Sequence, residues 1–229
     1  MRPLFQLGPR LALCASLVRE GSLFCDVGTD HAYLPIWLLK MGKISRALAC
    51  DVNPGPLEAA RRDGDRYEVG EELSFRLSDG LRQVSPQEAE DIAIAGMGGE
   101  LILRIIEETP WLRNEGKRLI LQPMSSVPEL REGLKELGFA VLKEEAAQEG
   151  TKVYSAFAVQ YTGAPVETGR LYPYLGKLRP GAPHVEAYAQ KVLRELTSQR
   201  KGALHVGDEE RAQRLGQWIQ MVEQEYIKA

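Results

Sequence analysis

The sequence predicts an α/β protein with a mainly parallel sheet, a terminal antiparallel hairpin and a C-terminal pair of helices. Short apolar runs alternate with helical patterns up to about residue 160, which is typical of crossover connections between parallel strands. The last two apolar runs are joined by a short connection without a helix, so they should pair antiparallel. Beyond a stretch rich in glycine and proline, apolar residues recur with a helical period.

Each element has its own pattern of apolar residues. The expected strands are Leu23–Asp26, Ala47–Asp51, Leu73–Leu77, Asp91–Ala95, Arg118–Gln122, Phe139–Glu144 and Val153–Gln160. The expected helices between them are Leu34–Met41, Pro56–Tyr67, Glu100–Glu108 and Val127–Leu137. The apolar run Leu11–Val18 predicts a short amphipathic helix, because it is too short to span a membrane. Six strands should run in one direction, with one strand of the hairpin opposed to them.

The change of period divides the chain into a sheet domain, 1–162, and a helical domain, 163–229. Apolar residues step by three and four from Val185 to Leu196 and again from Ala212 to Tyr226. Lys201-Gly202 and Gly207-Asp208 should separate these helices, with Asp208 as the N-cap of the second. The resulting antiparallel hairpin fits a packing appendage or a dimer contact as well as an element that holds a substrate.

Composition sets limits on function. The 229 residues carry a net charge of −3, so no overall basic field indicates nucleic acid, although residues 160–229 have a balance of +2. The three cysteines show no C-x-x-C spacing and no grouping with histidine, which argues against a structural zinc site and a disulfide framework. We therefore expect a cytoplasmic protein without metal or membrane attachment, and a monomer.

The segment Phe24–Pro35 is the most informative part of the chain. An apolar run ends in Asp26, Gly28 follows, and Asp30 precedes residues that can begin a helix. This pattern is typical of a first strand leading into a ligand-binding turn. The turn lacks the glycines of G-x-G-x-x-G, which disfavours a pyrophosphate and hence NAD. Its acids would attract a cationic, hydroxyl-rich ligand, and S-adenosylmethionine, with its sulfonium, ammonium and ribose diol, fits.

Further polar residues follow the next strands. Asp51, with Val52, ends the second strand and can accept both ribose hydroxyls. Asp79, with Gly80, closes the third and can accept from an adenine amino group. In open α/β sheets ligands bind beyond the carboxyl ends of the strands, so these acids should share one site with Asp26.

The fourth and fifth strands lead into candidate substrate contacts. Gly96-Met97-Gly98-Gly99 would let a flat base approach the backbone, and Met97 could pack against the base or the cofactor. Gln122 could offer its amide to the substrate.

Four of these segments carry a family resemblance. They are Asp26–Pro35 (DVGTDHAYLP), Asp51 with Asn53–Leu57 (NPGPL), Gly96–Gly99 (GMGG) and Leu119–Pro123 (LILQP). Together they resemble the bacterial tRNA (adenine-22-N1)-methyltransferase family, TrmK, over nearly the whole chain. The resemblance implies a Rossmann-like class I methyltransferase sheet, S-adenosylmethionine as methyl donor and N1 of adenosine 22 in the tRNA D loop as acceptor.

The chemistry needs little acid–base help, because adenine N1 has a free lone pair. Positioning can supply roughly 7–11 kcal/mol of the barrier, and a carboxylate would favour the cationic product. Asp30 and His31 are the catalytic candidates, and Arg10, Arg200 and Lys201 are candidate tRNA contacts. Three alternatives stay open: a methyltransferase acting on another RNA, a protein or a small molecule; a non-catalytic RNA-binding protein; and a nicotinamide-dependent oxidoreductase.

Overall fold

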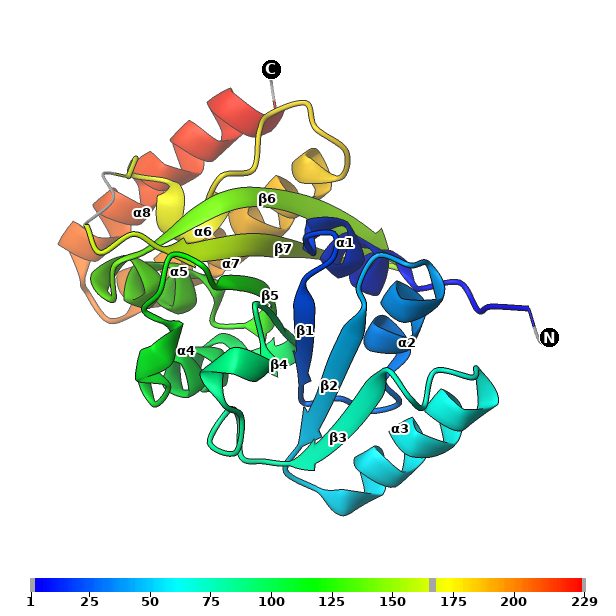
Figure 1. Cartoon of the computed structure of the whole chain (residues 1–229). Coiled ribbons are helices and arrows are strands. Elements are labelled where there is room, and N and C mark those ends of the chain that lie inside the picture. Colours follow the sequence, from blue (N-terminus) through cyan, green and yellow to red (C-terminus); the bar gives the residue numbers. More distant parts are fainter. Residues whose placement is uncertain (1–2, 165–167, 228–229) are drawn as a thin grey trace.

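The computed structural model describes residues 3–164 and 168–227 and contains one seven-stranded sheet with helices on both faces (Figure 1). The strand order is β3-β2-β1-β4-β5-β7-β6. The strands are β1 Leu23–Val27, β2 Arg46–Asp51, β3 Leu73–Leu77, β4 Asp91–Gly98, β5 Arg118–Ser125, β6 Phe139–Glu149 and β7 Lys152–Tyr161.

The sheet directions confirm the predicted layout. Strands β1 to β5 pair in parallel, and β7 lies antiparallel between β5 and β6. Strand β1 lies between β2 and β4, so the chain order reverses there. Ligands of open α/β sheets bind at such a switch point, beyond the carboxyl ends of the strands.

Helices cover the two faces of the sheet with separate apolar cores. The first core includes Cys14, Leu34 and Ala60, which come from the helices on one face. The second includes Ile102 and Leu130, from helices on the other face. These helices are α1 Pro9–Leu17, α2 Tyr33–Lys40, α3 Pro54–Arg66, α4 Gly99–Glu107 and α5 Val127–Glu136, with 3₁₀ turns at Pro86–Glu88 and Pro110–Leu112.

The fourth strand is longer than predicted. It continues past Ala95 to Gly98, with register irregularities around Met97 and a left-handed Gly96 at φ 79°. A bulged strand end of this kind is frequent beside active sites, because it redirects the backbone. Gly96, Met97 and Gly98 therefore belong to the end of the strand itself, and Gly99 begins α4.

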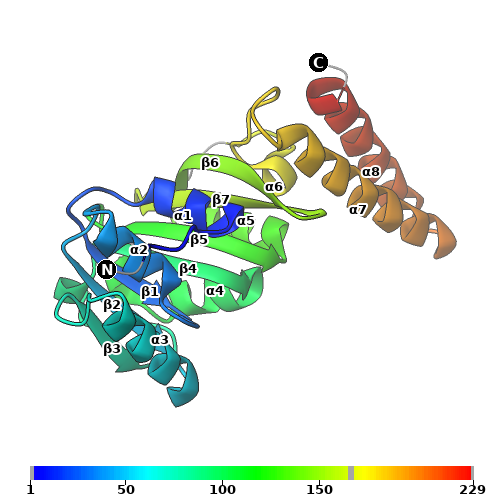
Figure 2. The ribbon, with the colours of Figure 1, turned by 90° about the vertical axis from the view of Figure 1, so that its right-hand side faces the viewer.

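The C-terminal segment forms α6 Tyr172–Leu175, α7 Val185–His205, α8 Glu209–Val222 and a π-helical turn Glu223–Ile227. Figure 2 shows α7 and α8 projecting side by side from the sheet. The prediction that Lys201-Gly202 ends the first helix is wrong, because α7 runs through both residues. The prediction for Asp208 is confirmed: its carboxylate accepts a hydrogen bond from the Arg211 backbone N–H at 3.0 Å.

A buried ion pair joins the C-terminal segment to the sheet. Arg131 of α5 and Glu144 of β6 form a salt bridge, and both side chains are fully buried. Arg131 also donates to the Pro173 carbonyl at 2.7 Å, and the Lys177 backbone N–H donates to Glu144 at 2.9 Å. The pair thus fixes the segment around α6 against the sheet.

Two further expectations concern cysteines and membranes. Cys14, Cys25 and Cys50 are buried free thiols, as small apolar residues would be. Within the described ranges, no helix combines the length and the apolar character needed to cross a membrane.

Candidate cofactor and substrate site

The turn after β1 requires glycine for its backbone conformation and for its packing. Gly28 has φ 75°, a left-handed conformation that favours glycine. The backbone N–H groups of Gly28 and Thr29 both donate to the Cys50 carbonyl, at 2.8 and 2.9 Å. A Cβ on Gly28 would lie 2.0 Å from the terminal methyl of Met97, so Met97 packs directly across the turn.

A cavity of about 420 Å³ opens beside this turn. Its walls include Arg10, Asp26, Asp30 and Gly96, so acidic and basic groups face one space. Asp26 is 8% exposed, and burial is the main cause that raises its pKa to about 6. The cavity can therefore hold a ligand that carries both an ammonium and a carboxylate group.

Arg10 is held in this cavity by Gln122. The Arg10 guanidinium donates to Gln122 Oε1 at 2.8 Å, and the Gly96 backbone N–H donates to the same oxygen at 3.1 Å. Gln122 is fully buried, and its Nε2 donates to the Pro123 carbonyl at 2.9 Å. Both ends of the amide are thus engaged within the protein. Arg10, one of the predicted tRNA contacts, lines the cavity.

The ends of β2 and β3 continue the same edge of the sheet. Asp51 accepts a hydrogen bond from the Asn53 backbone N–H at 2.7 Å through one oxygen, while Val52 is 59% exposed. The Ser78 backbone N–H donates to the Asp51 carbonyl at 2.9 Å, which ties the two strand ends together.

Beyond β3, Asp79 is half-exposed and lies 3.3 Å from the Arg82 guanidinium. Gly80 is left-handed, at φ 57°. Neither Asp51 nor Asp79 lines the 420 Å³ cavity. Both lie beyond it, at the carboxyl ends of β2 and β3.

His31 has partners on two sides. Its Nδ1 lies 2.9 Å from the Asp63 carboxylate of α3, and its Nε2 lies 3.9 Å from Asp30. Its ring stacks on Tyr33, with 5.1 Å between centroids. No local pattern in the sequence indicates Asp63, because the contact joins residues that are 32 positions apart in the chain.

Gly98 and Gly99 serve the start of α4. Gly98 is its N-cap residue, and an added Cβ would approach Ser125 Oγ to 3.1 Å. A Cβ on Gly99 would lie 2.3 Å from the Ser126 carbonyl oxygen. Gly99 is buried against the loop after β5, so this position has no space for a side chain.

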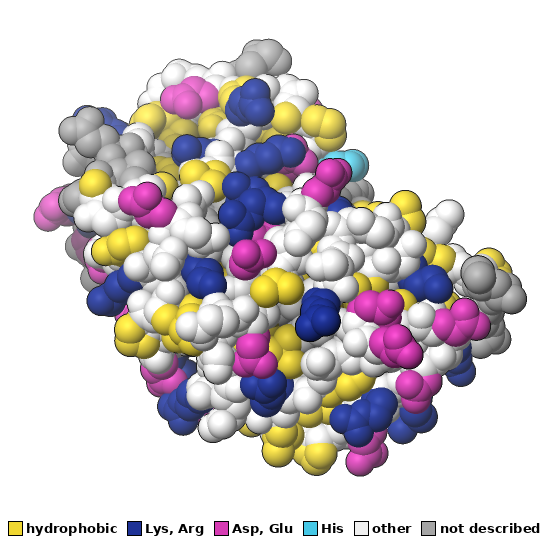
Figure 3. Space-filling view, viewed as in Figure 1, with side chains coloured by type: hydrophobic (Ala, Val, Ile, Leu, Met, Phe, Trp, Pro, Cys, Tyr) yellow, Lys and Arg dark blue, Asp and Glu magenta, His cyan; other side chains and the backbone are white. Residues whose placement is uncertain are grey.

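The remaining candidates, Arg200 and Lys201, lie on α7, away from the cavity. Both are exposed, and the Arg200 guanidinium lies against Gly216 of α8. On the face shown in Figure 3, basic and acidic side chains are interspersed, with a few Lys and Arg side chains gathered over β6. In 3–164 and 168–227, no group of three or more His, Cys, Asp or Glu side chains could hold a metal ion.

Comparisons with known proteins agree on one family. A profile described as a methyltransferase domain matches residues 7–157. The tRNA (adenine(22)-N(1))-methyltransferase of Bacillus subtilis (strain 168) is 33% identical over 180 residues, which cover 75% of this chain and 76% of that protein.

Two crystal structures resemble the whole fold. Streptococcus pneumoniae Sp1610, in complex with S-adenosyl-L-methionine, is 31% identical with a TM-score of 0.80, covering 93% of this chain and 100% of that one. The B. subtilis m1A22 tRNA methyltransferase TrmK is 25% identical with a TM-score of 0.73, covering 97% and 99%. The sheet, the acid-lined strand ends and these similarities together show that the chain belongs to the tRNA (adenine(22)-N(1))-methyltransferase family.

Proposed function

We propose that this protein transfers a methyl group from S-adenosylmethionine to N1 of adenosine 22 in the D loop of tRNA. The observation that carries the proposal is the cavity at the switch point of the sheet, where Asp26 and Asp30 face Arg10. Membership of the family supplies the acceptor, because the B. subtilis relative is a tRNA (adenine(22)-N(1))-methyltransferase.

The residues present fit this cofactor. Asp26 and Asp30 suit the ammonium group of its methionine portion, and Arg10 suits the carboxylate of that portion. Asp51 has one carboxylate oxygen left after its bond to Asn53, and this oxygen can accept a ribose hydroxyl.

The adenine end would lie further along the same edge. Val52, Asp79 and Gly80 are placed there, and the Asp79 carboxylate can accept from the adenine amino group. Gly28 and Gly96 line the cavity with backbone that carries no side chain, and the terminal methyl of Met97 packs over Gly28.

Bound S-adenosylmethionine supplies an electrophilic methyl group on a sulfonium. The chain's task is then to align adenine N1 with that methyl and to exclude water, since N1 attacks with its own lone pair. Asp30 lies beside the cavity, where its carboxylate favours the positive charge that develops on the base. Asp63 holds the His31 ring beside Asp30, so His31 positions this acid and needs to remove no proton.

Substrate RNA would approach the edge formed by the ends of β4 and β5. Gly98 and Gly99 shape this edge, and Gln122 contributes through Arg10 and Gly96. Arg200 and Lys201 of the helical domain, 163–229, offer cations for phosphates at a distance from the reacting base. With tRNA as substrate, the enzyme would act in the cytoplasm.

Methyl transfer from labelled S-adenosylmethionine to two tRNA transcripts tests the proposal. One transcript carries adenosine at position 22, and the other carries guanosine there. We expect label only in the first. Equal label in both would favour the alternative of a methyltransferase that modifies another RNA position.

A further inference from the structure

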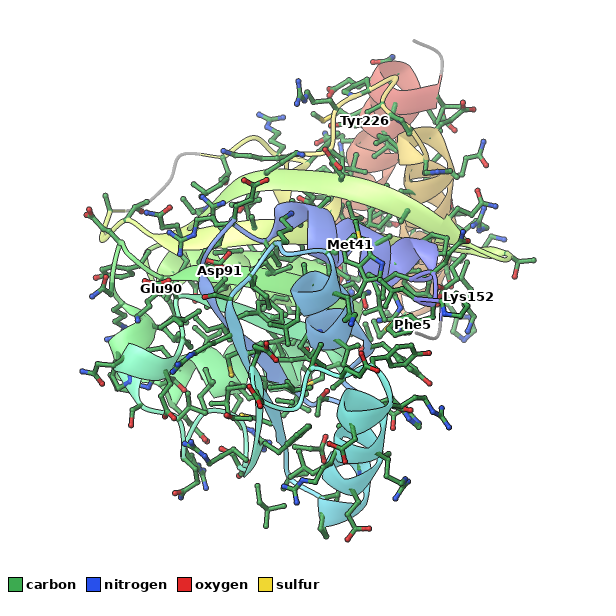
Figure 4. The ribbon with its side chains drawn as sticks, turned by 45° about the vertical axis from the view of Figure 1, so that its right-hand side comes forward. Phe5, Met41, Glu90, Asp91, Lys152 and Tyr226 are labelled. Atoms are coloured by element: carbon green, nitrogen blue, oxygen red, sulfur yellow. The ribbon has the colours of Figure 1, made fainter. Side chains whose placement is uncertain are left out.

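A second cavity, of about 340 Å³, lies next to the cofactor cavity and is lined by aromatic rings. Phe5 meets Tyr33 edge-on with 5.0 Å between ring centroids, and it meets Tyr67 in the same manner at 5.1 Å. The three rings come from the N-terminal segment, the start of α2 and the residue after α3. Figure 4 shows Phe5 between α1 and the end of α3. Three distant segments thus build one aromatic wall, which we call the aromatic pocket.

The aromatic pocket adjoins the cofactor cavity, which is the 420 Å³ cavity beside the turn after β1. Leu11 and Tyr33 line both spaces. Tyr33 is 41% exposed, and its ring stacks almost parallel to that of His31, at an interplanar angle of 8°. A chain of nucleotides entering the site could therefore present one base to the cofactor and the next to these rings.

Charge at the rim favours a nucleotide over a purely apolar guest. Asp63 and Arg66 also line the pocket. The Arg66 guanidinium lies 3.2 Å from Asp63 Oδ1, but its side chain is 55% exposed and keeps donors free for a phosphate. Proteins that bind single-stranded nucleic acid combine aromatic rings, on which bases stack, with cationic side chains that contact the phosphate backbone.

We propose that the aromatic pocket receives one unstacked base of the tRNA, a neighbour of the methylated adenosine, with Arg66 on its phosphate. The inference rests on the proposed function. A base that leaves its stack for modification removes a stacking partner from its neighbours, which costs free energy. A stacking surface that shares Tyr33 with the cofactor cavity replaces that partner and holds the opened loop in place.

Binding of tRNA to the protein saturated with S-adenosylhomocysteine tests the pocket. Tyr67→Ala should weaken tRNA binding roughly 5- to 150-fold, the range seen when a base-stacking ring is removed. Tyr67→Phe is the matched control: it keeps the ring, so tRNA affinity should stay within about twofold of the wild type. Affinity for S-adenosylhomocysteine should be unchanged in both variants. Unaltered tRNA affinity in a folded Tyr67→Ala variant would overturn the proposal.

Abasic substrates test the occupant without relying on a variant's folding. The wild-type protein is given tRNA lacking the base on either side of adenosine 22, one at a time. One of the two should show a KM raised roughly 5- to 150-fold, and this increase should vanish in Tyr67→Ala. If neither abasic tRNA raises KM, or if the penalty persists undiminished in Tyr67→Ala, the pocket holds no such base. Failure of the wild type to methylate intact tRNA would instead refute the proposed function.

Discussion

Gln122 holds Arg10 in the cofactor cavity through a hydrogen bond of 2.8 Å between residues 112 positions apart. The same amide oxygen accepts the Gly96 backbone N–H, so one buried side chain links α1, β4 and β5 at the strand ends. This hydrogen bond holds the Arg10 guanidinium in the cavity, so Gln122 is a positioning residue.

Gln122→Met should therefore weaken binding of S-adenosylhomocysteine about tenfold, because Arg10 loses the acceptor that directs it toward the ligand carboxylate. Arg10→Met should weaken it by about the same factor or more. Calorimetry with 5′-methylthioadenosine, which lacks the amino-acid portion, is the control. Its affinity should be unchanged, whereas an equal loss for both ligands would show that the cavity itself had collapsed.

The ionisation of Asp26 should make cofactor binding sensitive to pH. Its pKa is raised to about 6, chiefly by burial. The ligand ammonium favours the ionised carboxylate, so affinity is full above this pKa and falls as pH drops through it. Between pH 7 and pH 5, affinity for S-adenosylhomocysteine should fall about tenfold. Asp26→Asn should remove most of this dependence, and an undiminished pH dependence in Asp26→Asn would contradict the assignment to Asp26.

The Arg131–Glu144 pair should dominate the stability of the junction to the C-terminal helices. Both side chains are fully buried, so Arg131→Met leaves an unpaired carboxylate in the interior. Urea denaturation should show a free energy of unfolding lower by about 3–5 kcal/mol. The double variant Arg131→Met/Glu144→Gln should recover much of that loss. A loss below about 1 kcal/mol in the single variant would contradict this role.

The α7 cations should contribute to tRNA affinity through phosphate contacts. Replacing Arg200 and Lys201 together by alanine should weaken binding and reduce the slope of log K against log salt by about one to two. Arg113→Ala is the control, since Arg113 precedes β5 at the opposite edge of the sheet from the cavity. An identical salt slope in the double variant and the wild type would remove the helical hairpin from the RNA-binding surface.

The acids at the strand ends could be predicted because the pattern that marks them lies within a few neighbouring residues. Asp26 and Asp51 each follow an apolar run, and parallel strands bring their carboxyl ends to one edge of a sheet. The antiparallel hairpin was equally visible, since no helix separates its two strands. Both features are encoded by apolar runs and turn residues that lie within a few positions of each other in the sequence.

Features that depend on distant partners escaped the sequence analysis. Gln122 was expected to offer its amide to the substrate; its burial in β5 and its bond to Arg10 of α1 were not foreseen, because Arg10 lies 112 positions away. His31 gains Asp63 from α3 in the same way. Gly202 was expected to end a helix, but an exposed helical glycine costs only about 1 kcal/mol, and the packing of Leu196 and Ala203 offsets it.

The most direct test of the account is to identify the methylated base. The wild type and Asp51→Ala are each incubated with S-adenosylmethionine and unmodified tRNA, and the product nucleosides are identified after nuclease digestion. The account predicts N1-methyladenosine at position 22 with the wild type and little or none with Asp51→Ala, because this variant lacks the carboxylate that is proposed to accept the ribose hydroxyls. Methylation on another atom or at another position, or full activity of Asp51→Ala, would contradict it.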